Sequence, residues 1–578
     1  MSLLEKINKP DDIKKMNLDQ LESLAEEIRK VILERANKIG GHIGANLGFI
    51  EPTIALHYVF SSPIDKIIFD VSHQCYTHKI LTGRKEGFLN PEQYETISGY
   101  TNPKESSHDV FQVGHTSTSI SLATGLVIAR NLKGTKENII AVIGDGSLTG
   151  GQAYEGLNNA AILKSNIIIL VNDNEMSIAK SQGGIANHLK QLRDSHGKTE
   201  CNLFKALGFD YYYVEEGNDI KILIQTLDKV KDTTVPTVVH LHTLKGKGYP
   251  FAEQNKEATH SIKPNNDKEK SENATSMLAK FITQRCEKKE PVVAVTAAMP
   301  SGCGFTPTFR KKEGIHYIDV GIAEQHAISM ISGMAQNGAK PILAIYSSFL
   351  QRGYDQLSQD LALNNNPAVI VVLNAGLSSL DATHVGQFDI PMICSIPNLV
   401  YLAPANKEEY LAMLNWASNQ NQYPVLIRVS SIGKMISCGK PDTTDYSKLN
   451  TFKVEEKGEK VAIIGLGSFY YLGKQVENIL KKEMGFKATL INPHFMTGID
   501  EELLESLKQH HTIIVTLEDG MLEGGFGEKI TRYYGTSDMK VLNFGGRKEF
   551  LDREPLDYIY EKNHLKDNLI VEEIKRYL

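Results

Sequence analysis

The chain has 578 residues, 41% of them hydrophobic and 23% charged, which suggests several globular domains rather than one. The formal net charge of −6 is small at this length and gives no sign of a nucleic-acid-binding surface. No apolar run reaches the length of a membrane span, and the opening MSLLEKINKPDDIKK lacks the apolar core of a secretory signal. Six scattered cysteines without a C-x-x-C pair argue against a zinc site or a disulfide framework and favour a reducing compartment. We therefore expect a cytoplasmic protein of enzyme size, with no nucleic acid and no membrane among its partners.

The first region alternates between helix-like and strand-like segments. A charged segment with helical periodicity covers residues 18–40 and ends at a pair of glycines. Apolar runs at 139–144, 166–173 and 236–244 predict strands, with a helix at about 151–163 between the first two. This alternation predicts a mostly parallel sheet covered by helices. Residues 253–275 are polar, with almost no large apolar side chains, and predict a linker.

Two further blocks repeat the alternation. The second, from about 291 to 440, has strand-like runs at 316–321, 341–346, 368–373 and 424–429. The third, from about 458, has them at 460–467, 487–493 and 512–519. The sequence thus predicts an α/β protein with three domains, each a mostly parallel sheet flanked by helices, over residues 1–275, 276–445 and 446–578.

Oxygen-bearing side chains follow two neighbouring predicted strands. Asp145 stands between Gly144 and Gly146 after the first strand, and Asn174 follows the second, with a spacing that fits strand, turn, helix, turn and strand. Because ligands of open parallel sheets bind at the carboxyl ends of strands, both side chains can reach one point. A carboxylate, an amide oxygen and a backbone carbonyl suit Mg²⁺, and a diphosphate would supply further oxygens. The glycines would let the backbone approach that diphosphate, and the helix starting near Gly150 would offer free N–H groups.

The Gly-Asp-Gly stretch is also compatible with other structures. Read alone, it fits a tight turn equally well, because short glycine motifs occur by chance. A dinucleotide-binding fingerprint is excluded because Thr149 stands where its third glycine belongs, and no G-x-x-x-x-G-K-[ST] phosphate loop is present.

Gly-Asp-Gly followed by Asn-Asp-Asn at the end of the next strand resembles the thiamine-diphosphate signature of transketolase-like enzymes. Longer words, in order along the chain, resemble the 1-deoxy-D-xylulose-5-phosphate synthase family: GGHIGANLGFIEPTIALHYVF, DVSHQCYTHKILTGR, VGHTSTSIS, NDNEMSIA, IAEQHA, AIYSSFLQRGYDQ and EDGMLEGGFGE. The resemblance covers nearly the whole chain. It implies a transketolase-like fold in which the three domains bind the cofactor diphosphate with Mg²⁺, bind the pyrimidine, and form the C-terminal domain of that class.

The resemblance also implies roles for individual residues. The metal ligands would be Asp145, Asn174 and the carbonyl of Met176. The cofactor contacts would be His73, Gly114, His115, Thr116, Gly146, Ser147, Asn174, Tyr249, Glu324 and Phe349. The catalytic groups would be Glu324, His42, His260, His384 and Asp381. The substrate contacts would be Tyr346, Arg352 and Arg428.

Glu324 has a chemical rationale besides the resemblance. A carboxyl group that hydrogen-bonds the cofactor's pyrimidine nitrogen promotes the tautomer that takes a proton from the thiazolium ring. This needs a raised pKa in an apolar pocket, and the neighbours in GIAEQHAISM are mostly apolar. The alternative interpretation is a glutamate that is favoured at a helix N-terminus by the helix dipole. The histidines are assigned by their motifs, since imidazoles are the usual proton shuttles near neutral pH.

The sequence departs from the family pattern around the acceptor. Asn374 and Ser431 stand where the family has arginines that grip an aldehyde phosphate, and two such contacts could be worth about 1.5–3 kcal/mol each. The segment SSLDATHVG is one residue shorter than the family pattern, and Ser72 replaces a usual glycine. The family also usually carries a longer insertion after His188.

The resemblance implies a homodimer with its active site between the first and second domains of one chain. It implies that pyruvate loses CO₂ and condenses with D-glyceraldehyde 3-phosphate to give 1-deoxy-D-xylulose 5-phosphate, a precursor of isoprenoids, thiamine and pyridoxal. One alternative is a related thiamine-diphosphate transferase with a different, possibly unphosphorylated acceptor, which Asn374 and Ser431 favour. Another is a catalytically silent homologue, against which the intact Asp145, Asn174, Glu324 and His384 argue.

Overall fold

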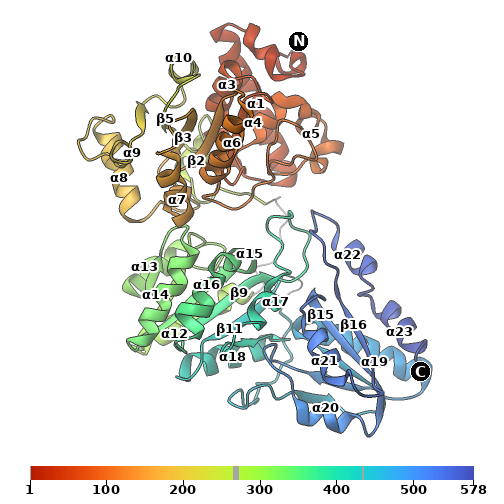
Figure 1. The fold of residues 1–578 in the computed structure, drawn as a ribbon. Coiled ribbons are helices and arrows are strands. Elements are labelled where there is room, and N and C mark those ends of the chain that lie inside the picture. The colour runs from red at the N-terminus through yellow and green to blue at the C-terminus, as the bar shows by residue number, and fades with distance from the viewer. Residues whose placement is uncertain (1, 264–272, 432–434) are drawn as a thin grey trace. The chain divides into compact units, whose positions relative to one another are not determined.

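The structure is a computed structural model that describes residues 2–263, 273–431 and 435–578 (Figure 1). The described residues divide into two compact units. Residues up to 263 and Val320–Ala323 form the first unit, and the other described residues form the second. The first unit contains one sheet and the second contains two, which confirms the α/β class predicted from the alternating segments.

The sheet of the first unit has five parallel strands in the order β1-β2-β3-β5-β4. Their bounds are β1 Lys66–Phe69, β2 Ile139–Gly144, β3 Ile167–Asp173, β4 Asp210–Val214 and β5 Pro236–His242. The runs predicted at 139–144, 166–173 and 236–244 are therefore strands, each with a carboxyl end at the same edge. The central strands read as continuous apolar runs because clusters of buried side chains cover both faces of this sheet.

Helices surround this sheet in the first unit. The predicted helix at 18–40 is observed as α1, whose start is capped by the Asn17 side chain through the N–H of Gln20. The helices are α1 Leu18–Ile39, α2 Ile43–Leu47, α3 Ile50–Val59, α4 Tyr76–Lys79, α5 Glu86–Leu89, α6 Ser119–Lys133, α7 Gly151–Ala160, α8 Gly183–Asp194, α9 Leu203–Leu207, α10 Ile220–Val230 and α11 Pro250–Gln254.

The segment predicted as a linker, residues 253–275, is partly folded, and the prediction is wrong there. Gly41 and Ile262 exchange backbone hydrogen bonds of 2.9 Å each, and the N–H of Gly44 donates to the carbonyl of Thr259. Thr259 is almost fully buried. Residues 264–272 lie outside the described part of the chain. The polar composition concealed this docking because it uses backbone groups rather than an apolar face.

The first sheet of the second unit has six parallel strands in the order β10-β11-β9-β8-β6-β7. The strands are β6 Val292–Thr296, β7 Tyr317–Asp319, β8 Lys340–Tyr346, β9 Val369–Ala375, β10 Val400–Leu402 and β11 Val425–Ser430. The sequence analysis missed β6 and β10. The associated helices are α12 Ala274–Glu287, α13 Pro307–Glu313, α14 Glu324–Gln336, α15 Ser347–Leu350, α16 Tyr354–Gln356, α17 Asp389–Cys394 and α18 Lys407–Asn419.

The last sheet has the order β12-β14-β13-β15-β16, with β12 as an antiparallel edge strand and the others parallel. Its strands are β12 Lys453–Glu456, β13 Lys460–Gly465, β14 Thr489–Asn492, β15 His511–Met521 and β16 Lys540–Gly546. Its helices are α19 Tyr470–Met484, α20 Glu501–Leu507, α21 Phe526–Tyr534, α22 Leu556–Lys562 and α23 Asp567–Lys575. Across the described residues, no helix combines the length and apolar character that crossing a membrane requires.

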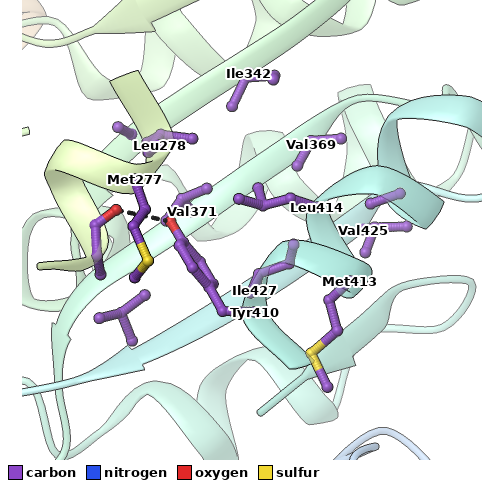
Figure 2. Packing of buried hydrophobic residues seen from close by; sticks show 14 of the residues in the cluster. Met277, Leu278, Ile342, Val369, Val371, Tyr410, Met413, Leu414, Val425 and Ile427 are labelled. Carbon is purple, nitrogen blue, oxygen red and sulfur yellow. Dashed lines mark hydrogen bonds between the residues drawn. The ribbon is translucent and has the colours of Figure 1, made fainter. Parts of the chain in front are cut away.

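The core beneath α18 shows how one helix face is fixed to a sheet. Figure 2 shows Tyr410, Met413 and Leu414 of this helix packed with side chains of β9 and β11, among them Val371 and Ile427. The Tyr410 hydroxyl donates to the carbonyl of Ala274, at 3.4 Å, which ties the same cluster to the start of α12. The spacing of 410, 413, 414 and 417 is that of one buried helix stripe.

Replacing Leu414 with alanine should lower the free energy of unfolding by about 2–5 kcal/mol, because this fully buried side chain would leave a cavity. The matched control is Leu411→Ala on the same helix, where 40% of the side chain is exposed. Urea denaturation followed by circular dichroism would compare them. Equal destabilisation by both variants would contradict the packing described.

Candidate active site

The carboxyl ends of β2 and β3 bring together the two residues that the sequence singled out. Gly144 is in register with Asn172, and the N–H of Asp145 donates to the Asn172 carbonyl at 3.1 Å. Asp145 and Asn174 are both buried. Their proximity, predicted from their spacing, is confirmed. Their role as metal ligands stays a prediction.

The surroundings of Asp145 suit a cation. The hydroxyl of Ser181 donates to its carboxylate at 2.7 Å. Burial and then the nearby Asp173 carboxylate raise the pKa of Asp145 to about 7. No group of three or more acidic, histidine or cysteine side chains with metal-ligand geometry occurs in the described residues. A divalent ion at Asp145 would therefore draw on Asn174, on backbone carbonyls and on oxygens of a ligand, which is the donor set that Mg²⁺ accepts.

The loop after β3 carries Met176 and is closed by its own backbone. Glu175 has a left-handed φ of 66°, Met176 forms a bridge with Lys180, and the N–H of Ser181 donates to the carbonyl of Glu175. The Asn174 side chain accepts the N–H of Met176 at 3.2 Å. Asn174 and the Met176 carbonyl thus belong to one compact turn.

The two loops that are predicted to line the diphosphate contact each other; their role as a cradle stays a prediction. A Cβ added at Gly146 would lie 2.9 Å from that of Ser177, so only glycine fits there. The hydroxyl of Ser117 donates to the carbonyl of Ser147 at 2.7 Å, which joins the loop of Gly114, His115 and Thr116 to the loop after β2.

Asp70, which the sequence analysis missed, organises the first of these loops. Its buried carboxylate accepts the N–H groups of Ser117 and Ser119, at 2.7 and 2.9 Å, at the start of α6. The available signal was its place directly after β1, which matches the place of Asp145 after β2.

The backbone at Ser72 adopts a conformation that favours glycine, which is the residue that the family usually has there. Its φ is 65°, in the left-handed region where glycine carries no penalty. Its buried hydroxyl donates to the carbonyl of Val113 at 2.6 Å and accepts the N–H of Thr101 at 2.9 Å. These two hydrogen bonds compensate for the backbone conformation.

Three histidines predicted for the site lie together in the first unit, His42 and His260 as catalytic groups and His73 as a cofactor contact. The ring centres of His42, His73 and His260 are 5.2–5.6 Å apart, and the docked segment around Thr259 delivers His260. Burial and then Lys245 lower the pKa of His42 to about 4, and burial holds that of His260 well below its ordinary value. The imidazoles of His42 and His260 are therefore neutral at pH 7.

Lys245 is a second residue that the sequence analysis missed. Its buried ammonium lies 3.2 Å from Nδ1 of His260 and donates to the carbonyl of Ser177. Burial lowers its pKa to about 8, and Asp145 acts in the opposite direction. The available signal was its place four residues before Tyr249, which the resemblance gives as a cofactor contact. Tyr249 itself packs beside the apolar cluster of α1 and is only half-buried.

In the second unit, Glu324 is the first residue of α14 and is buried. Burial raises the pKa of its carboxyl group, while Arg352, with Nη1 3.6 Å from Oε2, acts in the opposite direction. Among the described residues, Oε2 has no hydrogen-bond partner. The raised pKa confirms the expectation from its apolar neighbours.

Tyr346, Phe349 and His384 form an aromatic cluster in the same unit. The rings of Tyr346 and Phe349 stack at 5.7 Å, and His384 meets Phe349 edge-on at 5.6 Å. The carbonyl of Asp381 accepts the N–H of His384, and the Asp381 carboxylate accepts the hydroxyl of Thr383 at 2.9 Å. Asp381 thus shapes the turn that carries His384.

The structure contradicts the prediction that Arg428 grips a substrate. Its side chain is buried between Asp389 and Asp519, with Nε 2.6 Å from Asp389 and Nη1 on Asp519. Two carboxylates already neutralise this guanidinium, and it links β11, α17 and β15 within the second unit. The sequence alone could not distinguish an arginine that binds substrate from one that forms a buried ion pair, because either can stand at a strand end.

The two residues that replace family arginines are engaged in local hydrogen bonds. Burial raises the pKa of Tyr346, and a hydrogen bond with the Asn374 side chain acts in the opposite direction. Ser431 donates its N–H to the carbonyl of Ala375 and its hydroxyl to that of Leu377, at 2.8 and 2.7 Å. Both side chains are uncharged.

Comparisons with known proteins agree with this architecture. The family model described as 1-deoxy-D-xylulose-5-phosphate synthase matches residues 4–202 and 196–243. Models described as the pyrimidine binding and C-terminal domains of transketolase match 272–432 and 450–557. The parallel sheets and these matches define the chain as a member of the transketolase class.

Full-length relatives narrow the assignment. The 1-deoxy-D-xylulose-5-phosphate synthase of Caldanaerobacter subterraneus subsp. tengcongensis is 36% identical, covering 100% of this chain and 99% of the relative. That of Halothermothrix orenii is 37% identical, covering 99% and 96%. Among solved structures, the transketolase of Campylobacter jejuni aligns over 97% of this chain and 100% of its own, at 17% identity and a TM-score of 0.45. The chain belongs to the 1-deoxy-D-xylulose-5-phosphate synthase family.

Lys245→Met should raise the pKa of His42 above its value of about 4, because a neighbouring positive charge would be gone. The pKa should stay below the ordinary 6.5, since burial is the larger cause. Histidine NMR titration would measure this. Lys247→Met is the control, since its ammonium bonds instead to the carbonyl of Asn218, and it should leave the titration unchanged.

Proposed function

We propose that this chain catalyses the thiamine-diphosphate-dependent condensation of pyruvate with D-glyceraldehyde 3-phosphate, releasing CO₂ and forming 1-deoxy-D-xylulose 5-phosphate. Family membership over the full length supports this reaction. The product is a precursor for isoprenoid and thiamine biosynthesis. Bound thiamine diphosphate would supply the carbon nucleophile that adds to pyruvate and would accommodate the electron pair left by CO₂.

The observation that carries the proposal is the environment of Glu324. A buried carboxyl group with a raised pKa, whose Oε2 has an ion-pair contact with Arg352 but no hydrogen-bond partner among the described residues, fits a ring nitrogen of the cofactor's pyrimidine. Glu324 would hold a proton against that nitrogen. Phe349, stacked on Tyr346, offers an aromatic face for the same ring.

The first unit would hold the diphosphate and its metal. Asp145, Asn174 and the Met176 carbonyl would bind Mg²⁺, while Gly146, Ser147 and the loop from Gly114 to Thr116 would line the diphosphate. Lys245 would add a positive charge beside Asp145. The buried and neutral His42 and His260 can accept a proton without first having to release one.

Other parts of the proposal come from the resemblance alone. These are the homodimer, the cytoplasmic location, and the contacts of His73, Tyr249 and Arg352 with cofactor or substrate. His384 and Asp381 would act on the acceptor from their shared turn. The absence of a nucleic-acid partner remains an expectation from the small net charge of −6.

Glu324→Gln should lower turnover by about 100- to 10,000-fold, because glutamine cannot hold the proton at the pyrimidine. Release of CO₂ from pyruvate, with and without glyceraldehyde 3-phosphate, would be measured with Mg²⁺ and thiamine diphosphate, and the product identified by mass. Glu287→Gln, at an exposed position of the same unit, is the control. Unchanged turnover in Glu324→Gln would contradict the assignment and favour a silent homologue.

The acceptor site supports a second candidate function, a related transferase whose acceptor carries no phosphate. Arg428 is neutralised by Asp389 and Asp519, so it is not available to a phosphate group. Asn374 and Ser431 offer hydrogen bonds without charge. Charge-assisted hydrogen bonds are about twice as strong as neutral ones, so these replacements weaken selection for a phosphorylated aldehyde.

Ser431→Arg should therefore increase the preference for glyceraldehyde 3-phosphate over glyceraldehyde, as a ratio of kcat/KM, by about 10- to 100-fold. The control is Asn421→Arg, which adds the same charge at an exposed position. An unchanged ratio in Ser431→Arg would show that this position does not meet the acceptor phosphate.

A further inference from the structure

Arg193, in the last turn of α8, reaches back to the end of β3. Its guanidinium bonds the carboxylate of Asp173 through Nη1, and its Nη2 lies 3.8 Å from the carboxylate of Glu175. These acidic residues stand on either side of Asn174. The Arg193 side chain is 9% exposed, so its charge is directed at these partners rather than at solvent.

The Asp173 carboxylate is fully buried and connects several elements. It accepts Nε2 of His240 on β5 at 2.9 Å, and its other oxygen accepts the N–H of Glu175 at 3.2 Å. His240 in turn is bonded by the hydroxyl of Tyr211 on β4, at 2.8 Å. Asp173 therefore fixes the backbone just beyond β3, and Arg193 fixes Asp173 from the helix side.

The segment that leads into the N-terminal end of α8 contacts Asp145, a predicted metal ligand. Two residues before α8 begins, Ser181 donates its hydroxyl to Asp145 and its N–H to the carbonyl of Glu175. The loop from Asn174 to Ser181 is thus held at its end by Asp145 and at its start by Arg193. Apart from Ala179, its side chains from Glu175 to Ser181 are only partly buried or exposed, so apolar packing contributes little to its shape.

We propose that Arg193 is a positioning residue for the divalent metal: by holding Asp173 and Glu175, it fixes the turn that presents Asn174 and the Met176 carbonyl. This inference rests on the proposed function, which assigns these two groups as metal ligands. Arg193 would act through Asp173 and Glu175 rather than as a metal ligand itself. Partners of metal ligands typically change metal affinity about 10- to 100-fold when they are removed.

The test uses the full chain and compares Arg193→Gln, Arg193→Lys and Lys190→Gln. Lys190 lies on the same helix, is 62% exposed and pairs with the equally exposed Asp194, so its replacement is a matched loss of charge. Isothermal titration calorimetry would measure the Kd of Mg²⁺ at saturating thiamine diphosphate. It would then measure the Kd of Mn²⁺, which tolerates less regular coordination.

We expect Arg193→Gln to weaken Mg²⁺ binding about 10- to 100-fold, with a smaller loss for Mn²⁺. Arg193→Lys should recover part of the affinity, and Lys190→Gln should match the unaltered chain. If Arg193→Gln does not fold, Glu175→Gln serves as the test variant. The Glu175 side chain is half-exposed, so we expect the chain to tolerate its replacement, which removes one of the two acidic partners of Arg193. A weakening of about two- to fivefold is then expected.

Equal Mg²⁺ affinity in Arg193→Gln and Lys190→Gln would overturn the proposal, as would equal losses for Mg²⁺ and Mn²⁺. Failure of the proposed function has a different signature. In that case the unaltered chain would bind Mg²⁺ and thiamine diphosphate but release no deoxyxylulose phosphate, and the comparison of variants would still apply.

Discussion

Asp145 and Asp173 are two buried carboxylates at the ends of neighbouring strands, and the first unit must compensate their negative charges. Burial, and then the negative charge of the neighbouring Asp173, raise the pKa of Asp145, because both disfavour its charged form. Asp173 is compensated by His240 and Arg193, which come from β5 and α8. Asp145 accepts the hydroxyl of Ser181, and Lys245 and the backbone of Asn174 also stabilise its charge. None of these is an ion pair like that of Asp173, so a cation bound there would complete the compensation.

In the second unit, two buried charged groups differ in how completely the protein pairs them. Arg428 is satisfied within the protein by Asp389 and Asp519, and such a buried group is costly to leave without its partners. Oε2 of Glu324 has no hydrogen-bond partner among the described residues, and Nη1 of Arg352 lies 3.6 Å from it, at ion-pair distance. Complete pairing fits a structural role, while incomplete pairing fits a group that awaits a ligand.

The sequence was informative where the signal is local. Apolar runs located the strands that end at Asp145 and Asn174, because strand burial on both faces leaves an unbroken run. It missed β10, which is only three residues long, and it missed Asp70, Lys245 and Arg193 as parts of the site. Their partners are distant in sequence or placed by tertiary packing, and the composition of a polar segment does not reveal backbone docking such as that of Gly41 with Ile262. The family resemblance supplied the remaining roles, but it misjudged Arg428, whose burial only the fold determines.

The docking of residues 259–262 has a consequence for dissecting this protein into fragments. The family model for the first region ends at residue 243, yet Lys245 and His260 lie beyond that point and join the same cluster as His42. A fragment trimmed at the model's boundary would lose both groups and would also uncover the backbone of Gly41 and Gly44. The smallest expression unit that retains the cluster of His42, Lys245 and His260 therefore extends past Ile262.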